Sequence, residues 1–289
     1  MAARVSPAAT GEPARQATAH APRSPTRPRF RGHHRGVSEP DAAYFSAWYA
    51  DMGKAPDKDR LWTRLLGLPP HLLSTSVLSG AALDEVAGIL ALGPDDVLLD
   101  LACGRAGYGL ELVARSGARL VGLDFAPAAI DQARANVERL GLADRADLRV
   151  GDMTATGLER ASVTAVLCLD AAQFPPDFGA TFAEAHRVLA PGGPAVFTGW
   201  EPRDLHDPQV PERIRRVDLA AGLRSAGFTG VRSEDREDWL AAEREAWRAV
   251  VAMPESDDPA MQSLQAEGRR VFERGDPFRR VLATGRRAR

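Results

Sequence analysis

Residues 97–109 read Val-Leu-Leu-Asp-Leu-Ala-Cys-Gly-Arg-Ala-Gly-Tyr-Gly, an apolar run that passes directly into closely spaced glycines. A short apolar run bounded by glycines is typical of a buried strand. Glycine lets the backbone approach a ligand closely, and the free amides at the start of a following helix can bind one. The stretch therefore predicts a strand, a ligand-binding loop and a helix in succession.

From Val97 onward, short apolar runs alternate with helix-length segments, which predicts a doubly wound, Rossmann-like α/β sheet with helices on both faces. The predicted strands are Val97–Ala102, Arg119–Asp124, Asp147–Val150, Val163–Leu169, Ala195–Thr198, Gly230–Ser233 and Arg280–Thr284. Start and stop signals such as Pro127, Gly141 and Asp177 predict helices at 127–141, 177–189, 218–226, 237–252 and 258–273. The last two form an appended helical insertion before the final strand.

Upstream of the sheet, residues 38–92 have a helical pattern. Ser38 and Asp41 form a capping-box-like start, and Tyr44, Trp48 and Met52 recur at a spacing of four along one apolar face. Two further helices are predicted at 57–66 and 80–92.

Composition and charge limit the function classes. Of the 289 residues 44% are hydrophobic and 26% charged, which is ordinary for a globular protein and excludes a fibrous chain. Residues 1–37 carry seven arginines against Glu12, a local charge of +6, and we expect a disordered Arg/Pro-rich tail there. The remaining chain carries −8, which argues against nucleic acid as the main partner.

We expect a cytoplasmic protein. There is no apolar run of about 18 residues and no signal-peptide pattern, so we expect no membrane partner. The chain has two cysteines, Cys103 and Cys168, and both lie in apolar stretches that predict buried strands, as in a reducing compartment.

The glycine loop alone fits two kinds of cofactor. Gly104-x-Ala106-x-x-Gly109 nearly matches the dinucleotide fingerprint, and Asp124 follows 20 residues after Gly104, as a ribose-binding acid should. Asp100 favours a different ligand, because a carboxylate before the loop repels a pyrophosphate and suits a cation such as an amino acid ammonium.

Two later features extend this pattern. Asp152 follows the third predicted strand, where it can accept a hydrogen bond from an adenine amine, and Met153 beside it offers an apolar flank. Pro191-Gly192-Gly193 then precedes the fifth predicted strand.

As a set, the segments LLDLACGRAGYGLELVA, LVGLDFAPAAIDQA, RVGDM, VLCLDAAQF and EAHRVLAPGGPAVFTGWE resemble the class I S-adenosylmethionine-dependent methyltransferases. The run from Asp170 to Glu201 is similar to actinobacterial small-molecule methyltransferases that tailor natural products in secondary metabolism. The resemblance implies a seven-stranded sheet with an antiparallel last strand and S-adenosyl-L-methionine as cofactor. It also implies an N-terminal helical lid at 38–92 and a cofactor-binding core at 93–289, with the insertion at about 237–275. Ala106 stands where the family commonly has glycine.

The resemblance also implies roles for single residues. Those implied to bind the cofactor are Asp100, Ala102, Gly104, Asp124, Phe125, Asp152, Met153, Leu169 and Asp170. Asp100 and the backbone of the glycine loop would hold the methionine moiety, and Asp124 would bind both ribose hydroxyls. Phe125 would lie against the adenine, Asp152 and Met153 would address the adenine edge, and the pair after the fourth strand would close the site.

The methyl acceptor is expected to be a small, fairly apolar molecule. The residues predicted to line its pocket are Tyr44, Trp48, Tyr49, Gln173 and Trp200. Transfer from a sulfonium is an in-line displacement, so the protein must supply alignment, dryness and, for a hydroxyl or protonated amine, a base. No metal is expected and no catalytic base is evident. His71 and His206 are the histidines best placed for that role.

Other functions stay open. The chain could keep this fold without methyl transfer, as a cyclase or a non-catalytic partner, because fold does not settle function. An NAD-dependent dehydrogenase is favoured only by the glycine loop, and the chain after Thr198 is too short for a second substrate domain. Asp170-Ala-Ala-Gln-Phe174 lacks the Asn/Asp-Pro-Pro-aromatic segment that holds a flipped base in nucleic-acid methyltransferases. The accepting atom (O, N or C) and the choice between monomer and homodimer also stay open.

Overall fold

The computed structural model describes residues 41–54 and 56–289, and within them β1 (Val97–Leu101) is an interior strand, third in order, of a seven-stranded sheet. The other strands are β2 (Arg119–Asp124), β3 (Ala146–Val150), β4 (Ala165–Leu169), β5 (Pro194–Pro202), β6 (Thr229–Asp235) and β7 (Phe278–Arg286). Their order is β3-β2-β1-β4-β5-β7-β6, and only β7 runs antiparallel to its neighbours. The predicted seven strands and the antiparallel last strand are confirmed.

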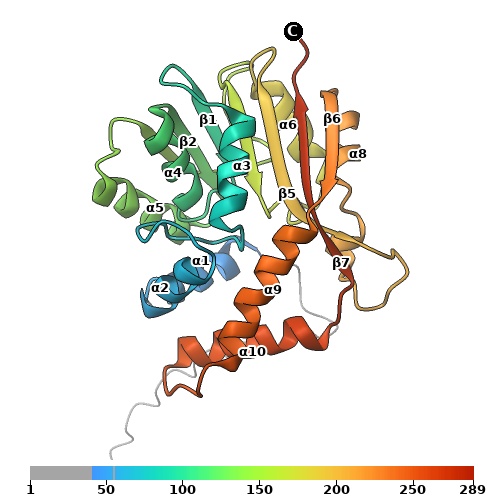
Figure 1. Ribbon diagram of the computed structural model, residues 1–289. Coiled ribbons are helices and arrows are strands. Elements are labelled where there is room, and N and C mark those ends of the chain that lie inside the picture. The colour runs from blue at the N-terminus through green and yellow to red at the C-terminus, as the bar shows by residue number, and fades with distance from the viewer. Residues whose placement is uncertain (1–40, 55) are drawn as a thin grey trace, which may run out of the picture. The chain divides into compact units, whose positions relative to one another are not determined.

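Helices cover both faces of the sheet, as Figure 1 shows. The strands alternate their side chains between the faces, so Leu98 packs with α3 (Gly80–Leu90), α4 (Gly107–Ser116) and α5 (Pro127–Leu140). Leu99, one residue on, packs with α6 (Phe178–Val188) and α8 (Leu219–Ser225) on the other face. The core therefore has two halves, one on each side of the sheet.

Local signals set the ends of these helices. Helix α5 begins at Pro127 and ends before Gly141, whose φ of +67° is accessible to glycine at little cost. The carboxylate of Asp177 accepts from the Ala180 amide and caps α6 as predicted. Helix α1 (Ala42–Met52) begins later than the predicted start at Ser38, because Asp41 supplies the cap by accepting from the Tyr44 amide. Ser38 and the predicted tail at 1–37 lie outside the described residues.

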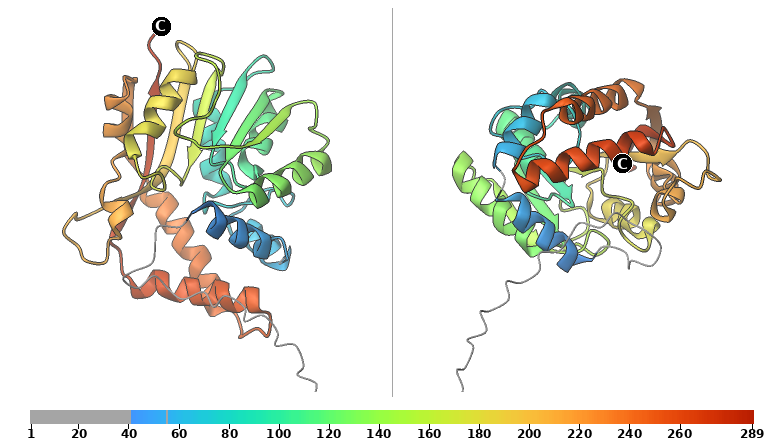
Figure 2. Two further views of the ribbon diagram at one scale, coloured as in Figure 1. Left: turned by 180° about the vertical axis from the view of Figure 1, so that it is seen from behind. Right: turned by 90° about the horizontal axis from the view of Figure 1, so that it is seen from below.

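Four helices gather beyond the carboxyl ends of the parallel strands, as the left view in Figure 2 shows. They are α1, α2 (Pro56–Leu65), α9 (Glu237–Ala252) and α10 (Pro259–Glu273). Trp62 of α2 and Trp247 of α9 lie with their ring centroids 4.6 Å apart. Of the two helices of the insertion, α9 shares the core of the sheet, because Trp239 and Ala246 belong to the same core cluster as Leu98, whereas Met261 and Leu264 of α10 pack with Leu61 and Trp247. Within the described residues, no helix combines the length and apolarity needed to cross a membrane.

Candidate functional site

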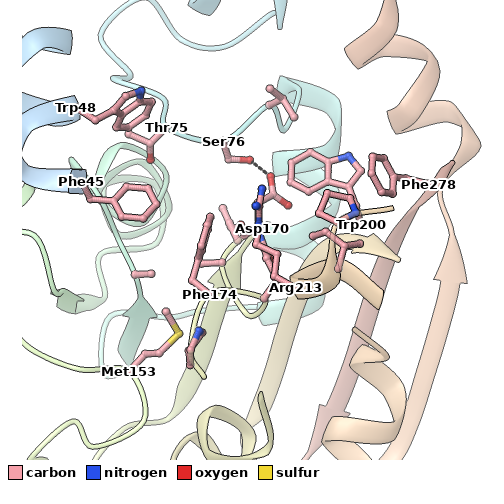
Figure 3. A pocket seen from close by; sticks show the side chains of 18 of the residues that line it. Phe45, Trp48, Thr75, Ser76, Met153, Asp170, Phe174, Trp200, Arg213 and Phe278 are labelled. Atoms are coloured by element: carbon pink, nitrogen blue, oxygen red, sulfur yellow. Dashed lines mark hydrogen bonds between the residues drawn. The ribbon is translucent and has the colours of Figure 1, made fainter. Parts of the chain in front are cut away.

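A cavity of about 950 Å³ lies between the carboxyl ends of the strands and the helices beyond them. Ala102, Asp124 and Trp200 line it from the sheet, and helices α1, α9 and α10 supply the facing walls. Figure 3 shows Phe45 and Trp48 at one side of this cavity, Trp200 and Phe278 at the other, and Asp170 between them. The volume is near the upper end of the roughly 300–1,000 Å³ usual for small-molecule sites.

Asp124 ends β2 and fixes the glycine loop against it. Its Oδ2 accepts from the Gly104 amide and its Oδ1 from the Ala126 amide, both at 2.9 Å. The side chain is 4% exposed, and burial raises the pKa of the carboxyl, which these two hydrogen bonds lower. Each carboxylate oxygen has a second lone pair, so Asp124 can still accept from a ligand in the cavity that it lines.

Asp100 and Gly104 are not among the residues that line the cavity, and their contact with the methionine moiety stays a prediction. Asp100 shares the strand face of Leu98 and therefore projects beneath α4, where it accepts from the Gly109 amide. Burial and the nearby charge of Asp124 raise the pKa of Asp100 to about 8. A Cβ on Gly109 would approach the Asp100 Oδ2 to 2.6 Å, so the glycine is required by this contact.

The loops after β2 and β3 provide the next part of the wall. Phe125, Asp152 and Met153 all line the cavity. Asp152 is exposed, and its Oδ1 accepts from both the amide and the hydroxyl of Thr154 at 2.8 Å. An apolar ring and a thioether thus stand beside a carboxylate at one end of the cavity, a setting that suits a purine with an exocyclic amine.

Helix α1 presents an aromatic face to the same end. Phe45, Trp48 and Tyr49 line the cavity, and Phe45 lies 5.4 Å from Phe125 between ring centroids. Tyr44 is not among the lining residues and is 42% exposed, and its role as a pocket residue stays a prediction. Adjacent helical positions differ by about 100°, and Phe45 rather than Tyr44 shares the face of Trp48 and Tyr49.

At the end of β4, Leu169 lines the cavity and Asp170 forms a buried ion pair with Arg280 of β7. Both guanidinium Nη atoms lie 2.8 Å from the Asp170 carboxylate oxygens, and Arg280 is 1% exposed. The hydroxyls of Thr198 and Ser76 also donate to this carboxylate. Asp170 is therefore held by three elements that are far apart in the sequence.

Glu243 of α9 extends this network to the far wall and was not predicted. It lines the cavity, is 8% exposed, and its Oε2 accepts from the Trp200 indole nitrogen at 3.3 Å. The Arg280 guanidinium lies over the Trp200 ring, with its central carbon 4.1 Å from the ring centroid. Burial raises the pKa of Glu243 to about 7, although Arg280 acts against this rise.

The remaining predicted residues divide between the cavity and the surface. Gln173 and Trp200 line the cavity, and Gln173 donates to the Asp170 carbonyl oxygen at 2.7 Å. Neither histidine offered as a base lines it. His71 is exposed and its Nε2 lies 2.7 Å from Glu111, and His206 is exposed on the loop after β5. Both histidines therefore lie outside the lining of this cavity, and their role as a base stays a prediction.

The cysteines are also not part of a reactive site. Cys103 and Cys168 are free and buried, and Cys103 lies in the glycine loop after β1. Burial raises the pKa of both thiols. In the part of the chain that the structure describes, no three His, Cys, Asp or Glu side chains cluster as metal ligands.

Comparisons with known proteins agree with this geometry. Residues 98–193 match the family model described as a methyltransferase domain. An uncharacterized methyltransferase of Synechocystis sp. is 32% identical over 164 residues, which cover 50% of this chain and 71% of that protein. The 24-methylenesterol C-methyltransferase 2 of Oryza sativa subsp. japonica is 28% identical, and the match covers 55% of this chain but 44% of that enzyme. The chain thus spans less than half the length of this curated relative.

Among solved structures, the [4+2]-cyclase SpnF superposes with a TM-score of 0.65 at 20% identity, covering 87% of this chain and 98% of the cyclase. This likeness concerns the fold. The sequence matches, the sheet order and the cavity at the carboxyl edge define a class of protein. The chain belongs to the class I S-adenosylmethionine-dependent methyltransferases, a family of enzymes.

Proposed function

We propose that this protein transfers the methyl group of S-adenosylmethionine to a small, largely apolar acceptor held in the same cavity. One observation carries the proposal: a single cavity joins the ends of β1, β2 and β4 to a chamber walled by aromatic side chains of β5, α9 and β7. A donor and an acceptor bound in one cavity can be aligned for in-line displacement with water excluded.

The donor would occupy the end near Asp124. Asp124 would accept from the ribose hydroxyls, Phe125 and Met153 would enclose the adenine, and Asp152 would accept from its amine. The backbone at Ala102 and the residues Leu169 and Asp170 would border the methionine moiety. These roles are supported by the lining positions of the side chains and by the family to which the chain belongs.

The acceptor would occupy the chamber of Trp200, Leu240, Trp247 and Phe278. These walls favour a flat or apolar molecule, because aromatic side chains bury large apolar area. The rice relative is named for a sterol, which accords with an apolar acceptor here. Residues 38–92 and about 237–275 would serve as lid and insertion that enclose it.

A second candidate is a protein of this fold that binds the cofactor without transferring methyl, as a cyclase or a non-catalytic partner. This second candidate is supported by the superposition on the [4+2]-cyclase, which covers 87% of this chain and 98% of the cyclase. Fold alone does not separate these functions, so an assay of transfer must do so.

Two measurements test the proposed function. Isothermal titration with S-adenosylhomocysteine should show binding that Asp124→Ala abolishes and that Asp144→Ala, which removes an exposed carboxylate in the turn after α5, leaves intact. Methyl-labelled S-adenosylmethionine, incubated with the enzyme and a low-molecular-mass extract of the source organism, should then label an acceptor. Binding without label transfer would favour the cyclase or non-catalytic function, and absence of binding would reject both.

A further inference from the structure

Glu243 occupies an unusual position for a carboxylate. It lies on α9 between Trp239 and Trp247, at a spacing of four, so all three side chains share one helix face. That face is buried against the sheet and the cavity, and Glu243 is 8% exposed there. A carboxylate on the buried face of an amphipathic helix is costly unless a specific partner holds it.

The partners of Glu243 orient its carboxylate without neutralising it. The Trp200 indole donates to Oε2 at 3.3 Å, and the Trp247 indole is a second hydrogen-bond partner. An indole nitrogen is a neutral donor that never takes the proton. The charged groups facing Glu243 from other elements are Arg280 of β7, whose Nε lies 4.0 Å from Oε2, and Asp170 after β4.

Arg280 is already committed to Asp170. Its two Nη atoms make the 2.8 Å contacts with that carboxylate, and only the more distant Nε faces Glu243. Burial therefore decides the ionisation of Glu243 and raises its pKa to about 7. A carboxyl group with a pKa near the working pH can both take up and release a proton, as general acid–base catalysis requires.

The other carboxylates that line the cavity have competing contacts or lie at its rim. Asp124 and Asp170 accept from backbone amides and from Arg280, respectively. Asp41 and Asp177 cap helices, and Asp152 accepts from Thr154. Asp276 pairs with Arg203 and Arg244, and Glu267 is exposed.

Glu243 lines the same cavity as the residues proposed to hold the donor, Asp124, Leu169 and Asp170. Arg280 lies within 4.0 Å of Glu243 and 2.8 Å of Asp170, so a single guanidinium joins Glu243 to the residue that follows β4. In Figure 3, Trp200, the hydrogen-bond partner of Glu243, lies beside Asp170 on the same side of the cavity as Phe278.

We propose that Glu243 is the general base of the reaction and that the acceptor is a hydroxyl or amine group that loses a proton. This inference rests on the proposed methyl transfer. The acceptor atom attacks the methyl carbon, the carbon–sulfur bond breaks with its electron pair going to sulfur, and the sulfonium becomes the thioether of S-adenosylhomocysteine. The acceptor's proton passes to the Glu243 carboxylate and leaves to water after product release.

The test compares three proteins: wild type, Glu243→Gln and Glu245→Gln. Glutamine keeps an oxygen for the Trp200 indole but cannot take the proton at neutral pH. Glu245 is exposed on the same helix and does not line the cavity, so its variant controls for charge removed from α9. The readouts are affinity for S-adenosylhomocysteine, the pH dependence of label transfer into the extract, and the pH dependence of tryptophan fluorescence with S-adenosylhomocysteine bound.

We expect Glu243→Gln to keep its affinity for S-adenosylhomocysteine within about twofold and to lose about 100-fold or more in transfer rate at pH 7.5. Wild type and Glu245→Gln should show a rate that rises through pH 7 and a fluorescence transition at the same pH, because Glu243 contacts two tryptophans. Glu243→Gln should show neither. Retained transfer in Glu243→Gln, or a transition that persists in it, would overturn the inference.

Failure of the proposed function is distinguishable from failure of this inference. If no protein transfers label although all three bind S-adenosylhomocysteine, methyl transfer is rejected, and the base role with it. The fluorescence titration then still decides whether Glu243 carries the ionisation. If transfer occurs equally in all three proteins, the proposed function stands and the base role is rejected.

Discussion

Replacing Glu243 with glutamine should stabilise the fold at alkaline pH. Burial raises the pKa of this carboxyl from its ordinary value of 4.5 to about 7, against the effect of Arg280 and together with that of Asp170. In the unfolded chain the pKa of this carboxyl returns to its ordinary value. Between these two pH values the folded protein therefore holds a proton that the unfolded chain has released, and by linkage the free energy of unfolding falls as pH rises.

The size of the effect follows from the same pKa. Each pH unit of the interval costs about 1.4 kcal/mol, so the wild type loses roughly 3 kcal/mol of unfolding free energy between pH 4.5 and pH 8 through this group. Glutamine does not titrate and avoids the loss. The difference in stability between Glu243→Gln and wild type should therefore grow by about 3 kcal/mol over that range, with the variant gaining.

Urea denaturation followed by far-ultraviolet circular dichroism at pH 5, 6.5 and 8 measures this difference without depending on the tryptophans near Glu243. Coincident transitions by a second probe must first establish two-state unfolding. Glu245→Gln serves as control and should follow the wild type, because Glu245 is exposed. A difference between Glu243→Gln and wild type that stays constant within about 0.5 kcal/mol from pH 5 to pH 8 would refute the reasoning, since that is the scale of a surface substitution.

Other predictions follow from the packing of the same site. Arg280→Met should cost about 3–5 kcal/mol of unfolding free energy in urea, because it leaves the Asp170 carboxylate buried without its cation. Gly109→Ala should cost about 1–3 kcal/mol by thermal or urea unfolding, since its Cβ would meet Asp100, whereas Gly88→Ala in α3, where nothing lies within 4 Å, should gain about 0.5–1 kcal/mol. Native protein should react with a thiol reagent far more slowly than urea-unfolded protein, because both cysteines are buried with raised pKa values. Fast native labelling would contradict that burial.

The fold was predictable because its determinants are local. Short apolar runs mark the strands, and Pro127, Gly141 and Asp177 mark helix ends by their own backbone preferences and side-chain bonds. The lengths of the strands were harder to predict from the sequence. Strand β5 extends to Pro202 and β7 begins at Phe278, because the two pair with each other over nine residues of each strand, a contact that neither segment reveals alone.

For two residues of the predicted site, spacing alone indicates which face of the element the side chain takes. Asp100 shares the period of Leu98, so its side chain belongs to the face under α4 and not to the open end of the sheet. On α1, the positions 45, 48, 49 and 52 follow the i, i+3, i+4, i+7 rule of a buried helix face, whereas Tyr44 falls outside it. The periodicity that identifies an element also decides which of its residues can reach a ligand.

The sequence indicates that two charged side chains are buried, but it does not indicate which partners they have. Arg280 stands two residues before Leu282 in an apolar strand, and Glu243 stands midway between two tryptophans on one helix face, so each position predicts a charge forced into the interior. A buried charge requires a partner, but periodicity does not say which one. Asp170 lies 110 residues from Arg280, and only the closing of β7 against β5, beside β4, brings them together. Helix periodicity therefore indicates the burial of Glu243, but only the tertiary structure brings Arg280 and Asp170 beside it.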